Sequence, residues 1–312
     1  MELTTSQSKK KPRVAALVGA TAAGKTAVAL ALAQSLGAEI VNADSLQVYR
    51  ELDVGTAKPS LEERALTPHH LIDVADPPEP YDAARYCREG RQVLSDLERR
   101  RVPPLVVGGT GLYLKALLSG LFAEGEPQAG VRERLRREMG TLGLPALYQR
   151  LLHLDPVTAT RLHPHDTYRI IRALEVMEAT GRPLSQFIAA HRFQDAPYAV
   201  LKLGLMLPRE ELYRKIDARV QLMLAAGWLE EVEALLSRYP PTVKPLQALG
   251  YRHLINYLTG RWSFEEALTL LARDTRRYAK RQLTWFSSDP EVRWYNPEQV
   301  EEMAAVLAEF FG

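Results

Sequence analysis

Residues 14–26 have the sequence VAALVGATAAGKT, an apolar run followed by a Gly-x-x-x-x-Gly-Lys-Thr motif. In this spacing, successive backbone N–H groups curl around phosphate oxygens, and the N-terminus of the next helix adds its partial positive charge. Residues 27–36 are good helix formers, and Gly37 stands where a C-terminal cap is expected. Strand, loop and helix in this order predict a phosphate-binding loop.

The predicted phosphate site comprises the whole loop. Lys25 is expected to neutralise a terminal phosphate, and the Thr26 hydroxyl to ligate Mg²⁺, which usually keeps several waters and shares phosphate oxygens. The loop residues are Gly19, Ala20, Thr21, Ala22, Ala23, Gly24, Lys25 and Thr26. The motif alone does not identify the phosphate compound that it binds.

Length and composition indicate a globular protein larger than one typical domain. The chain has 312 residues, 46% of them hydrophobic and 25% charged. No apolar stretch approaches the roughly 20 residues needed to cross a bilayer, and the polar residues 1–13 contain no signal-peptide core. Cys87 is the single cysteine, and no Cys/His cluster has zinc spacing. We therefore expect a cytoplasmic protein that does not associate with membranes.

The hydrophobic pattern predicts an α/β fold. Strand-like runs occur at residues 14–18, 39–43, 105–107 and 199–207, with helical stretches between them. Near-continuous apolar strands are typical of a parallel sheet with flanking helices, in which ligands bind beyond the carboxyl ends of the strands. After the fourth strand the pattern predicts helices nearly to the end of the chain, at residues 210–226, 229–237, 251–258 and 264–285.

Residues 128–194 differ from the rest of the chain. They contain ten Arg, no Lys and six acidic residues, a net charge of +4, whereas the whole chain carries +2. The segment is mainly helical by pattern and is bracketed by Pro- and Gly-rich residues at 125–130 and 195–197. We predict an inserted helical domain over 128–194 and a P-loop-type core from 1–127 and 195–312. Its charge fits either a solvated helical face or a nucleic-acid surface.

Two further strand ends carry polar side chains beside the phosphate loop. Asp44 follows the second strand and is the best candidate for a general base, although a Mg²⁺ contact or a turn cap would also use a carboxylate there. Gln47 has both a donor and an acceptor, so it is able to contact an adenine edge. Thr110 follows Gly108 and Gly109, and its hydroxyl suits either a phosphate contact or a helix cap. An NTPase more often has Asp at such a strand end, which argues against ATP hydrolysis.

Several cationic side chains share helical faces in the last third of the chain. Lys215 and Arg219 are four residues apart and are able to clamp a diphosphate, but pairing with Glu211 or Asp217 explains them equally well. A basic helical stripe at residues 273–281 lies close to Trp285, and cations interleaved with aromatic rings are typical of RNA binding. His69-His70 has no third ligand, so we expect it to pack or to be solvated.

Taken in order, these motifs resemble the bacterial tRNA dimethylallyltransferases, which prenylate the N6 amine of an adenosine beside the anticodon. The resemblance covers nearly the full length. It rests on residues 19–26, DSLQVY at 44–49, GTAKP at 55–59, HHLID at 69–73, GGTGLY at 108–113, GYR at 250–252 and KRQLTW at 280–285.

The resemblance implies that the loop, with Lys215, binds the diphosphate of dimethylallyl diphosphate. The target, adenosine 37, is flipped from the anticodon loop into the protein, as enzymes that modify a base require. Asp44 then deprotonates the N6 amine, while Arg219, Thr110, Lys25 and Mg²⁺ on Thr26 assist the departure of diphosphate. The family usually has Pro, Ser and Arg where this chain has Ala20, Ala23 and Lys215, and Lys lacks the bidentate fork of Arg.

The resemblance also implies an RNA surface that grips the anticodon stem-loop of tRNA. Its expected residues are Ser45, Leu46, Gln47, Tyr168, Arg169, Arg172, Gly250, Tyr251, Arg252, Arg277, Lys280 and Arg281. We expect a monomer.

Three alternatives fit less of the sequence. A P-loop nucleotide kinase shares the loop and the fold, but it requires neither the basic insertion nor the basic, aromatic helix near the C-terminus. A prenyltransferase acting on free adenine nucleotides needs no RNA-binding insertion. An RNA-binding protein without catalysis needs neither Lys25 and Thr26 nor Asp44.

Overall fold

The computed structural model describes residues 11–120, 129–191 and 196–312. The chain divides into two compact units. The core unit comprises residues 1–118 and 197–312, and the insertion unit comprises Ser119–Ala196. Both predicted domain boundaries, at 127/128 and 194/195, involve positions outside the described residues. Each unit is described separately below.

The core unit contains a six-stranded, all-parallel sheet in the order β3-β2-β4-β1-β5-β6. The strands are β1 (Arg13–Gly19), β2 (Glu39–Asn42), β3 (His69–His70), β4 (Pro104–Gly108), β5 (Ala199–Leu205) and β6 (Val292–Tyr295). The four predicted strands are confirmed. Strands β3 and β6 were not among the predicted strands, and β6 lies after the last predicted helix. Both are edge strands, and β3, with two residues, is too short for its sequence to show an alternation.

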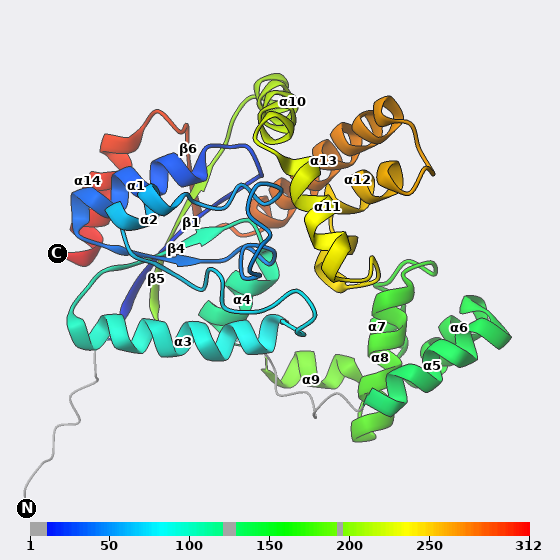
Figure 1. Cartoon of the computed structure of the whole chain (residues 1–312). Coiled ribbons are helices and arrows are strands. Elements are labelled where there is room, and N and C mark those ends of the chain that lie inside the picture. Colours follow the sequence, from blue (N-terminus) through cyan, green and yellow to red (C-terminus); the bar gives the residue numbers. More distant parts are fainter. Residues whose placement is uncertain (1–10, 121–128, 192–195) are drawn as a thin grey trace, which may run out of the picture. The chain divides into compact units, whose positions relative to one another are not determined.

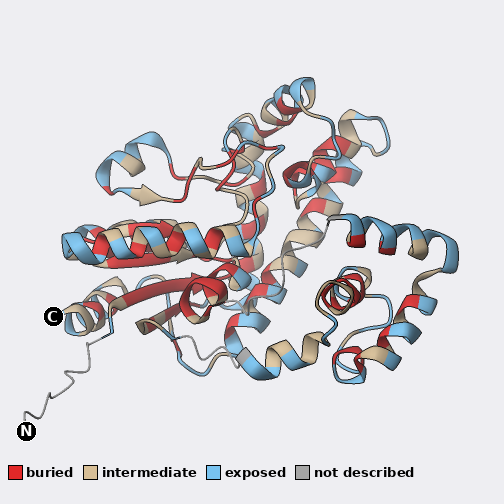
Figure 2. Cartoon of the chain, turned by 90° about the horizontal axis from the view of Figure 1, so that it is seen from below, coloured by how far each residue is buried: buried red, intermediate tan, exposed pale blue. Residues whose placement is uncertain are grey.

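Helices cover both faces of this sheet (Figure 1). Along β1, Ala16 and Val18 belong to a core cluster with side chains of α3 (Ala83–Arg100) and α4 (Gly111–Ser119). Leu17 belongs to a second cluster with side chains of α1 (Lys25–Leu36) and α14 (Val300–Phe311). This burial on both faces explains the near-continuous apolar strands, and Figure 2 shows them as buried.

The remaining helices of the core unit follow mostly after β5. They are α2 (Leu61–Leu66), α10 (Arg209–Ala225), α11 (Trp228–Arg238), the 3₁₀ helix η1 (Lys244–Gln247), α12 (Tyr251–Leu258) and α13 (Phe264–Ser287). Helices α10 to α13 agree with the predicted ranges to within two residues at each end. Trp228, Tyr251 and Leu254 join α11 and α12 to the cluster on the α3 face of the sheet.

The described residues of the insertion unit form helices joined by short loops, with no strand among them. It contains α5 (Ala129–Leu142), α6 (Leu144–Leu154), α7 (Pro156–Ala159), α8 (Thr167–Thr180) and α9 (Leu184–His191). Leu135, Leu151 and Leu174 are fully buried in a cluster of its own. Glu175, only 1% exposed, accepts hydrogen bonds from Arg132 at 2.7 Å and Arg172 at 3.0 Å. In neither unit is a described helix both long and apolar enough to span a membrane.

Candidate functional site

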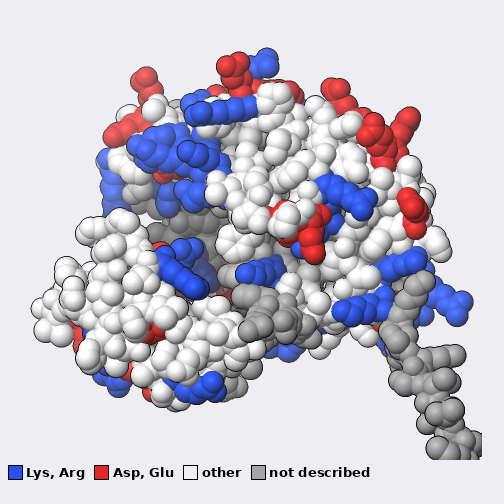
Figure 3. Space-filling model, turned by 180° about the vertical axis from the view of Figure 1, so that it is seen from behind, with Lys and Arg blue, Asp and Glu red and all other residues white. Residues whose placement is uncertain are grey.

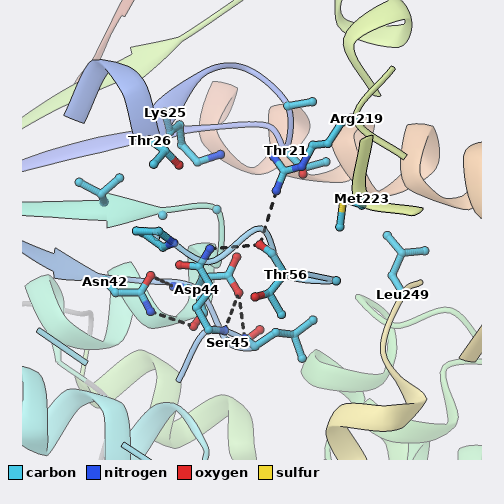
Figure 4. A pocket seen from close by; sticks show the side chains of 18 of the residues that line it. Thr21, Lys25, Thr26, Asn42, Asp44, Ser45, Thr56, Arg219, Met223 and Leu249 are labelled. Atoms are coloured by element: carbon cyan, nitrogen blue, oxygen red, sulfur yellow. Dashed lines mark hydrogen bonds between the residues drawn. The ribbon is translucent and has the colours of Figure 1, made fainter. Parts of the chain in front are cut away.

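A pocket of about 620 Å³ lies at the carboxyl ends of β1, β2 and β4. These strand ends bring together the phosphate loop, the segment from Asp44 to Gln47 and the residues Gly108 and Gly109, as predicted for a parallel sheet. Figure 4 shows Lys25 and Thr26 on one side of the pocket and Asp44 across from them. All the lining residues belong to the core unit.

The phosphate loop has the backbone that its motif predicts. Ala22 and Gly24 have φ of 64° and 90°, in the left-handed region, so the chain curls before α1 begins. The methyl groups of Ala20 and Ala23 are buried in the core, with exposures of 0% and 1%. The two alanines that depart from the family pattern therefore pack in the core, and phosphate binding by the backbone N–H groups of the loop stays a prediction.

Lys25 folds back over its own loop. Its Nζ donates to the carbonyl oxygens of Gly19 at 3.1 Å and Ala20 at 2.7 Å. Burial and, to a lesser extent, the nearby Arg219 cation lower the pKa of Lys25 to about 8, although the charge of Asp44 opposes the shift. The lysine therefore titrates close to physiological pH.

The two carboxylate oxygens of Asp44 have different surroundings. Oδ1 accepts the backbone N–H groups of Leu46 at 2.8 Å and Gln47 at 3.4 Å, so the turn-capping role that the sequence left open is present. Asn42 accepts the Asp44 N–H at 3.2 Å and fixes the start of this turn. Oδ2 makes no hydrogen bond within the described part of the chain. One oxygen is thus available for a proton or a cation.

Gln47 and Arg219 meet on the same backbone carbonyl. Gln47 Nε2 donates to the carbonyls of Thr56 at 3.1 Å and Ala57 at 3.2 Å, and Arg219 Nη2 donates to that of Thr56 at 3.5 Å. Because the amide nitrogen is engaged, only the amide oxygen of Gln47 is left for a base. Burial lowers the pKa of Arg219, and the charge of Asp44 opposes this effect.

Thr110 and Lys215 have specific partners. Thr110 Oγ1 accepts the Ser45 N–H at 3.1 Å and so ties the end of β4 to the residues that follow β2. Lys215 is 48% exposed and lies 3.3 Å from Glu211, the pairing that we weighed against a diphosphate clamp. Lys215 nevertheless lines the pocket, so both roles remain open to it.

Gln282 is a site residue to which sequence reasoning gave no role. Its Oε1 accepts the Thr21 N–H of the phosphate loop at 2.8 Å, and its Nε2 donates to the Gly109 carbonyl at 2.9 Å. It therefore holds the ends of β1 and β4 together, 261 positions away from Thr21. A polar side chain on the buried face of α13, between Ala279 and Phe286, was the signal that could have found it.

The candidate RNA-binding residues of α12 and α13 divide into exposed and buried ones. Arg252, Arg277, Lys280 and Arg281 are exposed, and Figure 3 shows Lys and Arg side chains gathered over these helices. Gly250 and Tyr251 are both buried, so their predicted RNA contacts have no exposed side chain behind them and stay a prediction. Tyr251 is 0% exposed, and its hydroxyl donates to Glu231.

The candidates in the insertion unit lie on α8. Tyr168 is 70% exposed and Arg169 65%, with Arg169 only 3.5 Å from Asp166. Arg172 is 23% exposed and pairs with the buried Glu175, which gives it a role in the fold of this unit. Its predicted RNA contact stays a prediction.

The pocket has the donors that Mg²⁺ prefers. The Thr26 hydroxyl at the start of α1 and the carboxylate of Asp44 both line it, and Mg²⁺ shares phosphate oxygens and waters with only one or two protein ligands. Within the described ranges, no three His, Cys, Asp or Glu residues gather as a metal site. A cation here would thus depend on the bound phosphates for its remaining ligands.

Two family models match the chain, "Isopentenyl transferase" over residues 12–73 and "IPP transferase" over residues 47–289. The chain belongs to the IPP transferase family. Among its relatives, a tRNA dimethylallyltransferase of Syntrophobacter fumaroxidans is 52% identical and covers 94% of this chain and 86% of its own. Another, of Geobacter sulfurreducens, is 46% identical over 98% of this chain and 99% of its own.

Solved structures of IPP transferases agree with the fold. The full-length tRNA isopentenylpyrophosphate transferase of Bacillus halodurans is 35% identical, with a TM-score of 0.73 over 97% of each chain. A eukaryotic dimethylallyltransferase acting on tRNA is 28% identical, with a TM-score of 0.82 over 95% of this chain and 77% of its own.

Proposed function

We propose that this protein transfers the dimethylallyl group of dimethylallyl diphosphate to N6 of adenosine 37, next to the tRNA anticodon, and releases diphosphate. The observation that carries the proposal is the pocket, in which a phosphate loop faces the free carboxylate oxygen of Asp44. Relatives at about half identity are named tRNA dimethylallyltransferase, which supports the same reaction and does not favour a kinase.

The donor fits the two ends of the pocket. The diphosphate would lie on the N–H groups of the phosphate loop, beside Lys25 and Arg219. The branched prenyl chain would lie against Met223, Trp228 and Leu249, apolar residues that also line the pocket. The Thr26 hydroxyl would hold Mg²⁺, which supplies positive charge to the leaving diphosphate when bound.

The transfer needs a base on one side and cations on the other. N6 of the flipped adenine attacks the allylic carbon, the carbon–oxygen bond to diphosphate breaks, and Asp44 Oδ2 takes one N6 proton. The second N6 hydrogen would be donated to the amide oxygen of Gln47. Lys25 and Arg219 stabilise the negative charge that grows on the diphosphate.

The RNA partner would be held by its backbone. We propose that the exposed cations of α12 and α13, with Tyr168 and Arg169 of α8, bind the anticodon stem-loop. We further propose that the protein acts on tRNA as a monomer in the cytoplasm.

The test is an acceptor competition. The protein is incubated with labelled dimethylallyl diphosphate, Mg²⁺ and an anticodon stem-loop carrying adenosine 37, with a stem-loop carrying guanosine 37 as the control. Label is expected only on the adenosine RNA. Transfer to free AMP alone, or phosphate transfer from ATP without prenylation, would contradict the proposal. Replacing Mg²⁺ by a chelator should strongly slow the transfer, and an unchanged rate would remove the metal from it.

A further inference from the structure

Glu231 of α11 binds three consecutive backbone N–H groups of the loop that precedes Thr56. Oε2 accepts those of Asp53 at 2.8 Å and Val54 at 2.6 Å, and Oε1 accepts that of Gly55 at 3.0 Å. Tyr251 donates its hydroxyl to Oε1 at 2.7 Å. A carboxylate with four donors is a strong anchor, since hydrogen bonds to a charged acceptor are about twice as strong as neutral ones.

The anchored loop rests directly on two aromatic rings. The rings of Trp228 and Tyr251 meet edge to face, with centroids 6.0 Å apart. A Cβ on Gly55 would lie 2.0 Å from Trp228 Nε1 and 2.5 Å from the Tyr251 hydroxyl oxygen. Position 55 therefore admits only glycine at this approach, and Glu231 sets the height of the loop above the rings.

The next two carbonyls of the same loop orient site residues. Thr56 and Ala57 accept the Gln47 amide, and Thr56 also accepts Arg219. Gln47 and Arg219 both line the pocket, whereas Glu231 is not among the residues that line it. A shift of the loop would move the base contact and the leaving-group cation together.

We propose that Glu231 is a positioning residue for the transfer, acting through the backbone of residues 53–57 on Gln47 and Arg219. The inference rests on the proposed function for its catalytic consequence. Lys58 anchors the loop independently of Glu231, because its Nζ donates to the Tyr49 carbonyl at 2.8 Å, to Asp73 at 2.6 Å and to Asp53 at 2.5 Å. Loss of Glu231 should therefore loosen the loop locally without unfolding the core unit.

Glu231→Gln is compared with Glu230→Gln, a matched change at the exposed neighbouring position on α11. The amide group keeps one acceptor but turns an NH₂ toward backbone donors. We expect the single-turnover rate to fall on the order of 10- to 100-fold, as for a small misplacement of reacting groups. The rate constant is informative because an unfolded fraction lowers the amplitude and not the rate. Glu230→Gln should leave both unchanged.

A double-mutant cycle with Gln47→Ala tests whether Glu231 acts through Gln47. If Glu231 acts through Gln47, Glu231→Gln should cost less in the Gln47→Ala background than in the natural protein. Additive losses, or a Glu231→Gln rate equal to that of the natural protein, would overturn the proposal. If Glu231→Gln does not fold, Tyr251→Phe, which removes one donor to Glu231, should show the same coupling in weaker form, and additivity there would overturn it equally.

Hydrogen exchange separates this proposal from the proposed function. The amides of residues 53–55 should exchange faster in Glu231→Gln than in Glu230→Gln, whatever reaction the protein catalyses. Unchanged exchange would show that Glu231 does not anchor the loop. Faster exchange in a protein that transfers no prenyl group would instead contradict the proposed function alone.

Discussion

Asp44 combines an observed structural contact with the role of general base that we propose for it. Its Oδ1 caps the turn that carries Leu46 and Gln47, while its Oδ2 is left toward the pocket. The cap holds the carboxylate in place, so the free oxygen is oriented before any substrate binds. Such preorganisation is what an efficient general base requires.

Asp44→Asn should separate the two roles of this residue. The amide oxygen is able to keep the turn hydrogen bonds, but the side chain no longer accepts a proton. We expect prenyl transfer to slow about 10²- to 10⁴-fold, the usual contribution of a general base, with tRNA affinity unchanged. Asp44→Ala, which also removes the cap, should in addition destabilise the turn. Normal turnover in Asp44→Asn would exclude Asp44 as the base.

The lowered pKa of Lys25 predicts that binding of dimethylallyl diphosphate depends on pH. With its pKa near 8, Lys25 is protonated below that pH and loses its charge above it. Diphosphate favours the charged form, so donor affinity should fall by up to about tenfold per pH unit above pH 8, with proton uptake on binding. Calorimetry at pH 9 in buffers of different ionisation enthalpy measures that uptake. Lys25→Arg, which stays charged, should bind without it, and the same absence in the natural protein would refute the assignment.

Single helices combine residues of different roles at neighbouring positions. On α13, the exposed cations Lys280 and Arg281 directly precede Gln282, which is buried and joins two strand ends. On α8, the exposed Arg169 lies one turn from Arg172, which neutralises the buried Glu175. The shared charge of these two arginines therefore does not imply a shared function.

Arg169→Ala and Arg172→Ala should have different effects. Arg169→Ala should weaken tRNA binding and reduce the slope of log affinity against log salt by about 1, as expected for one lost phosphate contact. Arg172→Ala should instead lower the stability of the insertion unit by about 1–3 kcal/mol, because Glu175 loses one of its partners. Binding titrations at several salt concentrations and thermal unfolding measure the two effects. An unchanged slope for Arg169→Ala would show that Arg169 contacts no phosphate and belongs to a solvated helical face.

The whole molecule has separate apolar cores in its two units. The core unit packs on both faces of the sheet and contains the entire described pocket. The insertion unit has its own cluster around Leu174, which is 0% exposed. We therefore expect donor binding to depend on the core unit alone.

Leu174→Ala should uncouple RNA binding from donor binding. A buried Leu→Ala change costs about 2–5 kcal/mol, so the insertion unit should unfold at a lower temperature. Between that temperature and the unfolding of the core unit, affinity for dimethylallyl diphosphate should persist while affinity for tRNA falls. Differential scanning calorimetry measures the unfolding of the two units, and binding titrations with dimethylallyl diphosphate and with tRNA at each temperature measure the two affinities. Leu142→Ala, at a 65% exposed position of the same unit, is the control, and equal loss of both affinities would contradict separate stability.

The sequence by itself determined the phosphate-loop motif, strands β1, β2, β4 and β5, the helical insertion and the position of Asp44, since local spacing and apolar periodicity encode these features. Only the tertiary structure decided that β3 and β6 complete the sheet, that Tyr251 is buried, and that Gln282 and Glu231 hold the strand ends and the loop at 53–57. These assignments depend on hydrogen bonds between residues up to 261 positions apart. No local pattern records such pairs, because they form only when the chain is folded.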